Sequence, residues 1–223
     1  MREEQSRNAE LPPASDAVPY ETRKRKVAVL LFEGIEVLDF AGPYEVFAMA
    51  GKQGGDFEVY TTAETVHPVQ AVGGLRLIPD YALADCPQPD ILIVPGGMGT
   101  RRDLANRTLL DWIATVGKEC ELLISVCTGA LLLAAAGLLG GLEITTHHGA
   151  IPLLRELAPH ATIREDVRYT DNGRILLSAG VSAGIDVSLH ALGKLHGPER
   201  ALLAAGQMEY PWLSPDGEPE RID

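Results

Sequence analysis

Cys127 is the residue most suited to chemistry in this chain. The segment LLISVCTGALLL, residues 122–133, places it between an apolar strand and an apolar helix. A strand-to-helix turn exposes its side chain at the end of a sheet, and the first amides of the helix point toward it. The small residues Ser125 and Gly129 permit so tight a turn, and a helix N-terminus favours a thiolate. We predict a nucleophile with a low pKa; the alternative is a cysteine that only packs.

Functional groups in an open α/β sheet gather where parallel strands end. This rule selects two loops besides that of Cys127, one with Asp39 and the other with Gly96 and Gly97. The amides of Gly97 and Thr128 would then stabilise negative charge on a substrate bound to Cys127. The alternative for Gly97 is an ordinary glycine turn. The spacing PGGMG matches neither common nucleotide-binding motif, so no nucleotide is expected there.

Asp39 lies in the apolar stretch VLDFA, just before a predicted helix. One interpretation makes it the N-cap of that helix, a common role for aspartate. In the other, the carboxyl group exchanges a proton with a buried thiol, and burial keeps it partly neutral near pH 7.

His147 and His148 follow Cys127 by twenty and twenty-one residues, across one predicted helix. A base could approach the thiol from this position. Paired histidines can also bind metal, but no Cys, His or Asp set at zinc-like spacing accompanies them, and structural histidines are common. We expect no metal and no organic cofactor.

Composition and charge restrict the possible partners. The chain has 223 residues and a formal net charge of −12, which opposes binding to nucleic acid or to an anionic membrane. The N-terminus has no apolar signal-peptide region, and no run reaches the ~18 apolar residues of a membrane span. Three cysteines without a CxxC pair argue against a disulfide framework. We therefore expect a cytoplasmic protein with reduced thiols.

The order of elements predicts one α/β domain over residues 25–212, between flexible tails at 1–24 and 213–223. Buried apolar runs alternate with helical periodicity, which indicates a mostly parallel sheet with helices on both faces. Two glycine-containing turns, at residues 73–74 and 172–173, predict β-hairpins. The predicted strands are 27–32, 57–62, 91–94 and 122–126. The predicted helices are 39–50, 130–139, 151–157, 183–195 and 198–208, and a further helix runs through Leu109 to Val116.

Five motifs in order resemble the ThiJ/PfpI superfamily, which has a flavodoxin-like, class I glutamine amidotransferase-like fold with a nucleophile elbow. The motifs are LDFAGPYEVF, VPGGMG, SVCTGALLLAAAGLL, TTHHGA and SAGVSAGIDVSLHAL. Two branches are most similar: isocyanide hydratases and the ligand-binding domains of AraC-type transcription regulators. Regulators carry a helix-turn-helix region after this domain, and only a short tail follows Trp212 here. The resemblance therefore favours the hydratase branch.

The resemblance also assigns roles. Cys127 matches the family nucleophile, Asp39 the acid that contacts its sulfur, Gly97 and Thr128 the oxyanion positions, and His147 a site histidine of several branches. Thr128 replaces the histidine of the protease-like branch, and the amidotransferase His-x-Glu pair is missing, so neither proteolysis nor glutaminase activity is expected. The implied function is cofactor-independent hydration of a small-molecule isocyanide, by a homodimer. The alternatives are a glyoxalase- or deglycase-type enzyme, a redox-sensing stress protein, or a ligand-sensing domain.

Overall fold

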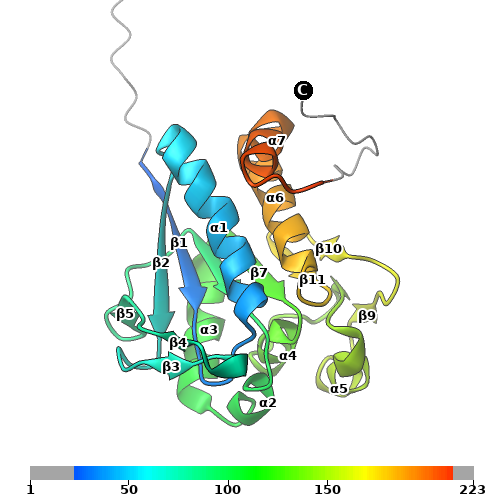
Figure 1. Ribbon diagram of the computed structural model, residues 1–223. Coiled ribbons are helices and arrows are strands. Elements are labelled where there is room, and N and C mark those ends of the chain that lie inside the picture. Colours follow the sequence, from blue (N-terminus) through cyan, green and yellow to red (C-terminus); the bar gives the residue numbers. More distant parts are fainter. Residues whose placement is uncertain (1–22, 213–223) are drawn as a thin grey trace, which may run out of the picture.

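A seven-stranded sheet forms the centre of the computed structural model, which describes residues 23–212 (Figure 1). All neighbouring strands run parallel except the pair at one edge, which is an antiparallel hairpin. In spatial order the strands are β10 (Tyr169–Asp171), β11 (Ile175–Ser178), β7 (Leu122–Val126), β6 (Ile91–Val94), β1 (Arg25–Leu30), β2 (Phe57–Ala63) and β5 (Tyr81–Ala82). The predicted α/β class and mostly parallel sheet are confirmed.

The three central strands are apolar along most of their length because both faces of the sheet are covered. Every residue of β6 and β7 is buried, as are the last four residues of β1. The registers Val27↔Ile91 and Val94↔Ser125 bring these strands to a common carboxyl edge. The segments that contain Gly97 and Cys127 leave the sheet at this edge, and so does the chain that leads from β1 to Asp39 in the first turn of α1.

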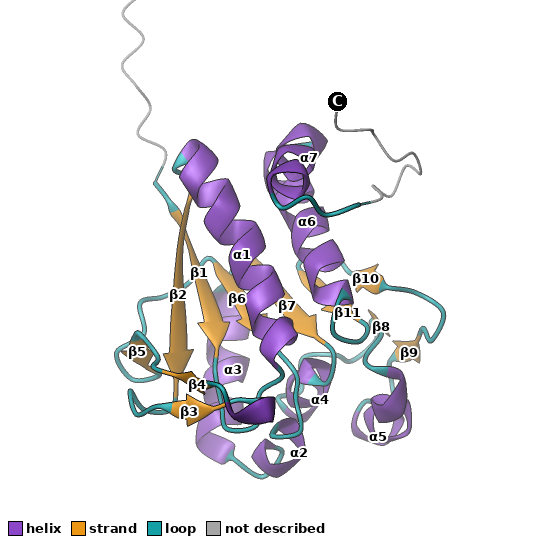
Figure 2. Ribbon diagram, in the orientation of Figure 1, coloured by secondary structure: helices purple, strands orange, loops and turns teal. Residues whose placement is uncertain are grey.

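Helices cover both faces of the sheet, as Figure 2 shows. Helices α1, α6 and α7 pack together on one face, and α3 and α4 pack together on the other. The short helices α2 and α5 lie near the carboxyl ends of the strands. The bounds are α1 Val37–Gly54, α2 Thr100–Asp103, α3 Arg107–Glu119, α4 Gly129–Ala135, α5 Ile151–Leu157, α6 Ala183–His196 and α7 Pro198–Gln207.

Helix α1 begins earlier than predicted, and this changes the role of Asp39. The N-cap is Glu36, whose side chain makes no capping hydrogen bond, so Asp39 is the third residue of the helix. The N-cap interpretation of Asp39 is therefore wrong. Pro43 lies inside the helix and lacks an amide, so it cannot donate the usual helical hydrogen bond to the Asp39 carbonyl group.

Both predicted hairpins are present, and several short elements were not predicted. The first hairpin pairs β3 (Val69–Gln70) with β4 (Arg76–Leu77) around Gly73. Helix α4 ends at Ala135, four residues before its predicted end, because residues 136–141 form turns. The unpredicted elements are α2, β5, and the pair β8 (Glu143–Ile144) and β9 (Thr162–Ile163).

The predicted tails 1–24 and 213–223 lie, apart from residues 23 and 24, outside the described residues. Within the described chain, no helix is both long enough and apolar enough to span a bilayer.

Candidate active site

The turn at Cys127 has the geometry of a nucleophile elbow. Cys127 lies between β7 and α4 with φ of 55°, in the left-handed region that is costly for a residue with a side chain. Its amide donates to the carbonyl oxygens of Ser178 (3.2 Å) and Ala179 (3.1 Å) at the end of β11. Its carbonyl oxygen accepts from the Thr146 hydroxyl group at 2.6 Å. Two neighbouring segments therefore hold the turn in its strained conformation.

Two backbone amides stabilise negative charge on the Cys127 sulfur. The residue is only 5% exposed, and the amides of Val181 and Thr128 both lower the pKa of its thiol. The Thr128 amide starts α4, as predicted from the helix N-terminus. The Val181 amide comes from the loop before α6, where Val181 has a φ of 42°. A β-branched residue in this region is strained, so the loop must be held by other contacts.

The loop of Val181 is held by an ion pair at the start of α6. Arg168 donates from Nε to Asp186 Oδ2 at 2.5 Å, and from NH2 to the Ser182 hydroxyl group at 3.2 Å. Tyr210 donates to the second oxygen of Asp186 at 3.0 Å. Asp186 thus contacts Arg168 and Tyr210 and anchors the loop that carries Val181.

Asp39 is completely buried beside the thiol. Its Oδ2 accepts a hydrogen bond from the Gly96 amide at 3.1 Å, whereas Oδ1 is buried with no hydrogen-bond partner among the described residues. Burial raises the pKa of Asp39 to about 6, against the opposing effects of the Cys127 thiol and the Gly96 amide. A carboxyl group with this pKa can accept and return a proton near neutral pH.

The low pKa predicted for Cys127 is contradicted by the structure. Burial, followed by the negative charge of Asp39, raises the pKa of the thiol to about 12, and the two amides offset only part of this effect. The prediction of a low pKa rested on the helix N-terminus, whose effect is smaller than those of burial and of Asp39. The resting pair therefore consists of a thiol and a carboxylate, with one proton to exchange between them.

Gly96, Gly97 and Thr128 pack too closely to admit larger residues at the glycine positions. A Cβ at Gly96 would lie 2.5 Å from Thr128 N and 2.7 Å from Asp39 Oδ2, and one at Gly97 would lie 2.3 Å from the Gly34 carbonyl oxygen. The Gly97 amide donates to the Thr128 hydroxyl group at 2.8 Å. The Gly97 amide is therefore engaged within the protein, and its predicted role toward an oxyanion stays a prediction.

His147 lies at the same cavity as Cys127. Its Nδ1 accepts from the Gly149 amide at 3.1 Å, so the proton of the neutral ring is on Nε2. Burial, and then the charges of His148 and Arg101, lower the pKa of His147 and favour this neutral form. The ring of His148 stacks on it at 4.1 Å between centroids. His147 can thus offer an N–H donor, and a catalytic role for it stays a prediction.

The cavity in front of Cys127 has a volume of about 220 Å³. Cys127, Thr128, Gly97 and His147 were predicted site residues, and all four line this cavity. The other lining residues were not predicted, and neither was Thr146, which supports the turn. Thr146 and Val181 come from loops far apart in the chain, so no local motif could identify their contacts. The remaining lining residues are Glu36, Met98, Arg101 and Gly149.

No group of three or more His, Cys, Asp or Glu side chains in residues 23–212 is arranged to hold a metal ion. The expectation that the reaction needs neither metal nor organic cofactor stays a prediction.

Fold and site together define a class of protein: a mostly parallel α/β sheet with a cysteine on a strained strand-to-helix turn beside a buried acid. The chain belongs to the DJ-1/PfpI family, whose model matches residues 25–194. It is 35% identical over 185 residues to an isonitrile hydratase of Pseudomonas putida, covering 83% of this chain and 78% of the relative. A ThiJ/PfpI family protein from Pseudomonas syringae has a similar structure, with a TM-score of 0.77 and 28% identity, over 94% of this chain and 84% of that one.

Regulators are also among the relatives. The chain is 26% identical over 206 residues to the HTH-type transcriptional regulator GbdR of Pseudomonas aeruginosa strain PAO1. The match covers 92% of this chain but only 56% of the regulator. The relatives of this chain therefore include both an isonitrile hydratase and a transcriptional regulator.

Proposed function

We propose that the protein hydrates an isocyanide to an N-substituted formamide, with Cys127 as the nucleophile and Asp39 as the proton carrier. One observation carries this proposal: the buried Asp39 carboxyl group, with Oδ1 unpartnered, lies beside a thiol on a strained turn. An isocyanide carbon must gain both a nucleophile and a proton, and this pair supplies both. Identity of 35% to an isonitrile hydratase supports the same reaction class.

The first step forms a thioimidate. Asp39 accepts the thiol proton as the Cys127 sulfur forms a bond to the terminal carbon of R–NC. Asp39 then returns this proton to the same carbon, which gives R–N=CH–S–Cys127. Because the pKa of Asp39 is about 6, the carboxylate is available as a base at neutral pH.

The second step releases the product. Water adds to the thioimidate carbon, with Asp39 accepting a proton from the water and passing it to the substrate nitrogen, which gives R–NH–CH(OH)–S–Cys127. The C–S bond then breaks as the hydroxyl group loses its proton to Asp39, Asp39 returns this proton to the sulfur, and R–NH–CHO leaves. The amides of Thr128 and Val181 stabilise negative charge on the sulfur during both steps. We assign to the Nε2–H of His147 a hydrogen bond to the substrate, with no proton transferred from it.

A redox-sensing role has less support, because burial raises the pKa of Cys127 and oxidation requires the thiolate. Glyoxalase chemistry would use the same cysteine and acid, so it is tested beside the hydratase reaction. A ligand-sensing role would leave substrates unchanged.

The test follows formamide formation from cyclohexyl isocyanide by mass spectrometry. Wild type, Cys127→Ala and the control Cys86→Ala are compared, because Cys86 is a half-buried thiol that does not line the cavity. We expect turnover by wild type and the control, and a loss of about 10³-fold or more in Cys127→Ala.

Equal turnover in Cys127→Ala would remove Cys127 from the mechanism. If wild type turned over neither alkyl nor aryl isocyanides but consumed methylglyoxal, the glyoxalase alternative would replace the hydratase proposal. Binding without turnover of either substrate would favour a sensor.

We also propose a cytoplasmic homodimer. Three free cysteines fit a reducing compartment. Most of α6 is buried within the chain, so the support for a dimer comes from apolar side chains around the β3–β4 hairpin. Ile78 is 75% exposed, Val66 54% and Leu75 47%. Light scattering at micromolar concentration should give twice the chain mass; a monomer would contradict this proposal.

A further inference from the structure

Two cavities open at the carboxyl edge of the sheet, and a different arginine of α2 lies at each of them. Arg101 lines the cavity of Cys127. Its neighbour Arg102 lines a second cavity, also of about 220 Å³, at the carboxyl ends of β1 and β2. No described residue lines both cavities. The two arginines differ in whether other residues of the protein already pair with their charge.

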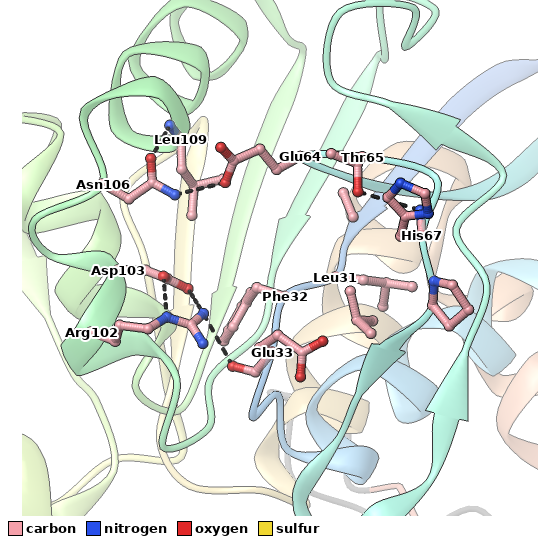
Figure 3. Close-up of a pocket in the computed structure, with 13 residues that line it drawn as sticks. Leu31, Phe32, Glu33, Glu64, Thr65, His67, Arg102, Asp103, Asn106 and Leu109 are labelled. Atoms are coloured by element: carbon pink, nitrogen blue, oxygen red, sulfur yellow. Dashed lines mark hydrogen bonds and ion pairs between the residues drawn. The ribbon is translucent and has the colours of Figure 1, made fainter.

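The charge of Arg102 is neutralised within the protein, as Figure 3 shows. Its guanidinium group donates from Nε and Nη2 to the two oxygens of Asp103, at 2.8 and 2.7 Å, and from Nη2 to the Glu33 carbonyl oxygen at 3.3 Å. The hydrogen bonds to Asp103, and then the charges of Asp103, Glu33 and Glu64, raise the pKa of Arg102 against the opposing effect of burial. Arg102 is therefore not available to a ligand.

Arg101 has no such partner. Its side chain is exposed, and it forms no ion pair among residues 23–212. Glu36 lines the same cavity and also forms no ion pair there, so these two opposite charges do not neutralise each other. A guanidinium group without a counterion, in the same cavity as a nucleophile, can bind an anionic group of the substrate.

The charged and polar groups divide this cavity into an acidic side and a side with hydrogen-bond donors. Burial raises the pKa of Asp39 and the charge of Glu36 adds to this effect, so Glu36 lies on the Asp39 side. Burial, and then the charges of His148 and Arg101, lower the pKa of His147, so Arg101 lies on the His147 side. The ring of His147 offers its Nε2–H there, because Nδ1 accepts from a backbone amide. An anionic group is thus directed toward Arg101 and His147, and away from Glu36.

The proposed reaction fixes one end of the substrate and leaves the other end in the cavity. The isocyanide carbon must reach the Cys127 sulfur, so the rest of the molecule occupies the space in front of it. The volume of about 220 Å³ is below the roughly 300–1,000 Å³ of pockets for drug-sized ligands, so the substrate must be small. Met98, which is 67% exposed, and Val181 offer apolar contacts to a short hydrocarbon segment.

We propose that the substrate of Cys127 is a small isocyanide that carries a carboxylate, and that Arg101 and His147 bind this carboxylate. A planar carboxylate matches the parallel N–H donors of a guanidinium group. The hydrogen bond from His147 to the substrate is thereby assigned to its acidic end. This inference rests on the proposed hydration of an isocyanide and adds the class of isocyanide that the site selects.

The test compares isocyanoacetate with isocyanoacetamide, a neutral isocyanide of nearly the same shape. Mass spectrometry follows the N-formylglycine and N-formylglycinamide that they give, with cyclohexyl isocyanide as the reference substrate. We expect wild type to prefer isocyanoacetate by about threefold or more in kcat/KM. The net charge of −12 disfavours anions in general, so such a preference must come from local charges. Arg101→Gln should lower the ratio of the two kcat/KM values about three- to tenfold, because it removes charge-assisted hydrogen bonds to the acid alone.

Arg107→Gln is the matched control, because it removes the same charge from an exposed position of α3 that does not line the cavity. It should change the ratio by less than about twofold. Equal kcat/KM for the acid and the amide in wild type, or an equal fall of the ratio in both variants, would overturn this inference and leave isocyanide hydration standing. If wild type hydrated none of the three isocyanides, the proposed function would fail, and this inference with it.

Discussion

The two cavities at the carboxyl edge of the sheet have the same volume, about 220 Å³, but Asp39, which lies beside Cys127 without lining the first cavity, is held differently from Glu33 and Glu64, which line the second. Asp39 is 0% exposed and has a buried oxygen without a partner. Glu33 and Glu64 are exposed, and each accepts a hydrogen bond from a neighbouring segment. The backbone is strained at Cys127 and Val181 in the first cavity, whereas no residue of the second has a positive φ.

The difference shows what burial does to a carboxyl group. A buried carboxyl group is costly to ionise, so its pKa rises toward the range in which it can transfer protons. An exposed carboxylate stays solvated and can attract a cation at little cost. At the same edge of the sheet, burial thus raises the pKa of Asp39 toward neutral pH, whereas Glu33 and Glu64 stay solvated.

Asp39→Asn should lower activity more than the substitutions described below, because it removes the proposed proton carrier and keeps the side-chain shape. We expect isocyanide hydration to fall by about 10²- to 10⁴-fold, since general acid–base groups contribute effects of that size. Formamide production at pH 7.5 measures this change. Turnover within a factor of about three of wild type would show that the buried carboxyl group does not carry the proton.

The same substitution should stabilise the protein at high pH. The pKa of Asp39 is raised from 3.8 to about 6 on folding, so wild type loses stability as the pH rises from about 4 to about 6. Asparagine does not titrate, so Asp39→Asn should gain up to about 3 kcal/mol at pH 8 and about half as much at pH 5. Urea unfolding at both pH values measures the gain. Glu64→Gln, at an exposed acid, should change stability by less than about 0.5 kcal/mol; a pH-independent gain for Asp39→Asn would contradict the explanation by burial.

Local patterns predicted the elements that are governed by short-range rules. The buried strands Ile91–Val94 and Leu122–Val126 were predicted with their observed bounds, because both faces of the sheet require continuous apolar residues. Asn172-Gly173 correctly predicted the hairpin of β10 and β11. The position of Cys127 on a strand-to-helix turn followed from the same local sequence.

The remaining features depend on contacts between distant segments. The Val181 amide, the Thr146 hydroxyl group and the Asp39 carboxyl group come from two loops and the first turn of α1, and only the folded chain brings them to Cys127. The low pKa predicted for Cys127 failed because the prediction weighed the helix N-terminus alone, whereas burial and the charge of Asp39 have the larger effect on the thiol. The N-cap was one of two interpretations of Asp39 because the start of α1 at Val37 has no capping side chain to mark it.

Gly96→Ala tests how tightly the first cavity is packed. The added methyl group would lie 2.5 Å from Thr128 N and 2.7 Å from Asp39 Oδ2, so both groups must move. We expect a loss of about 1–3 kcal/mol in unfolding free energy and a clear fall in turnover. Gly140→Ala is the control, because a Cβ there meets nothing within 4 Å and the residue has no positive φ. Urea unfolding measures the stability of both variants. Equal unfolding free energies for Gly96→Ala and Gly140→Ala would show that the segments of Gly96, Thr128 and Asp39 can move apart at little cost.

Thr146→Val tests whether the strained turn of Cys127 needs support from outside its own segment, and it should affect turnover less than Gly96→Ala because Thr146 does not line the cavity. The substitution keeps the shape of the side chain but removes the hydroxyl group that donates to the Cys127 carbonyl oxygen at 2.6 Å. That oxygen would be left buried without its partner, which should lower the unfolding free energy by about 1–3 kcal/mol. Thr115→Val is the matched control: its hydroxyl group donates to the Asp111 carbonyl oxygen on the exposed face of α3, so its loss should cost less than about 0.5 kcal/mol. If the two variants lost equal stability, the contact at Cys127 would be worth no more than a surface hydrogen bond, and the strand and helix alone would suffice to hold the turn.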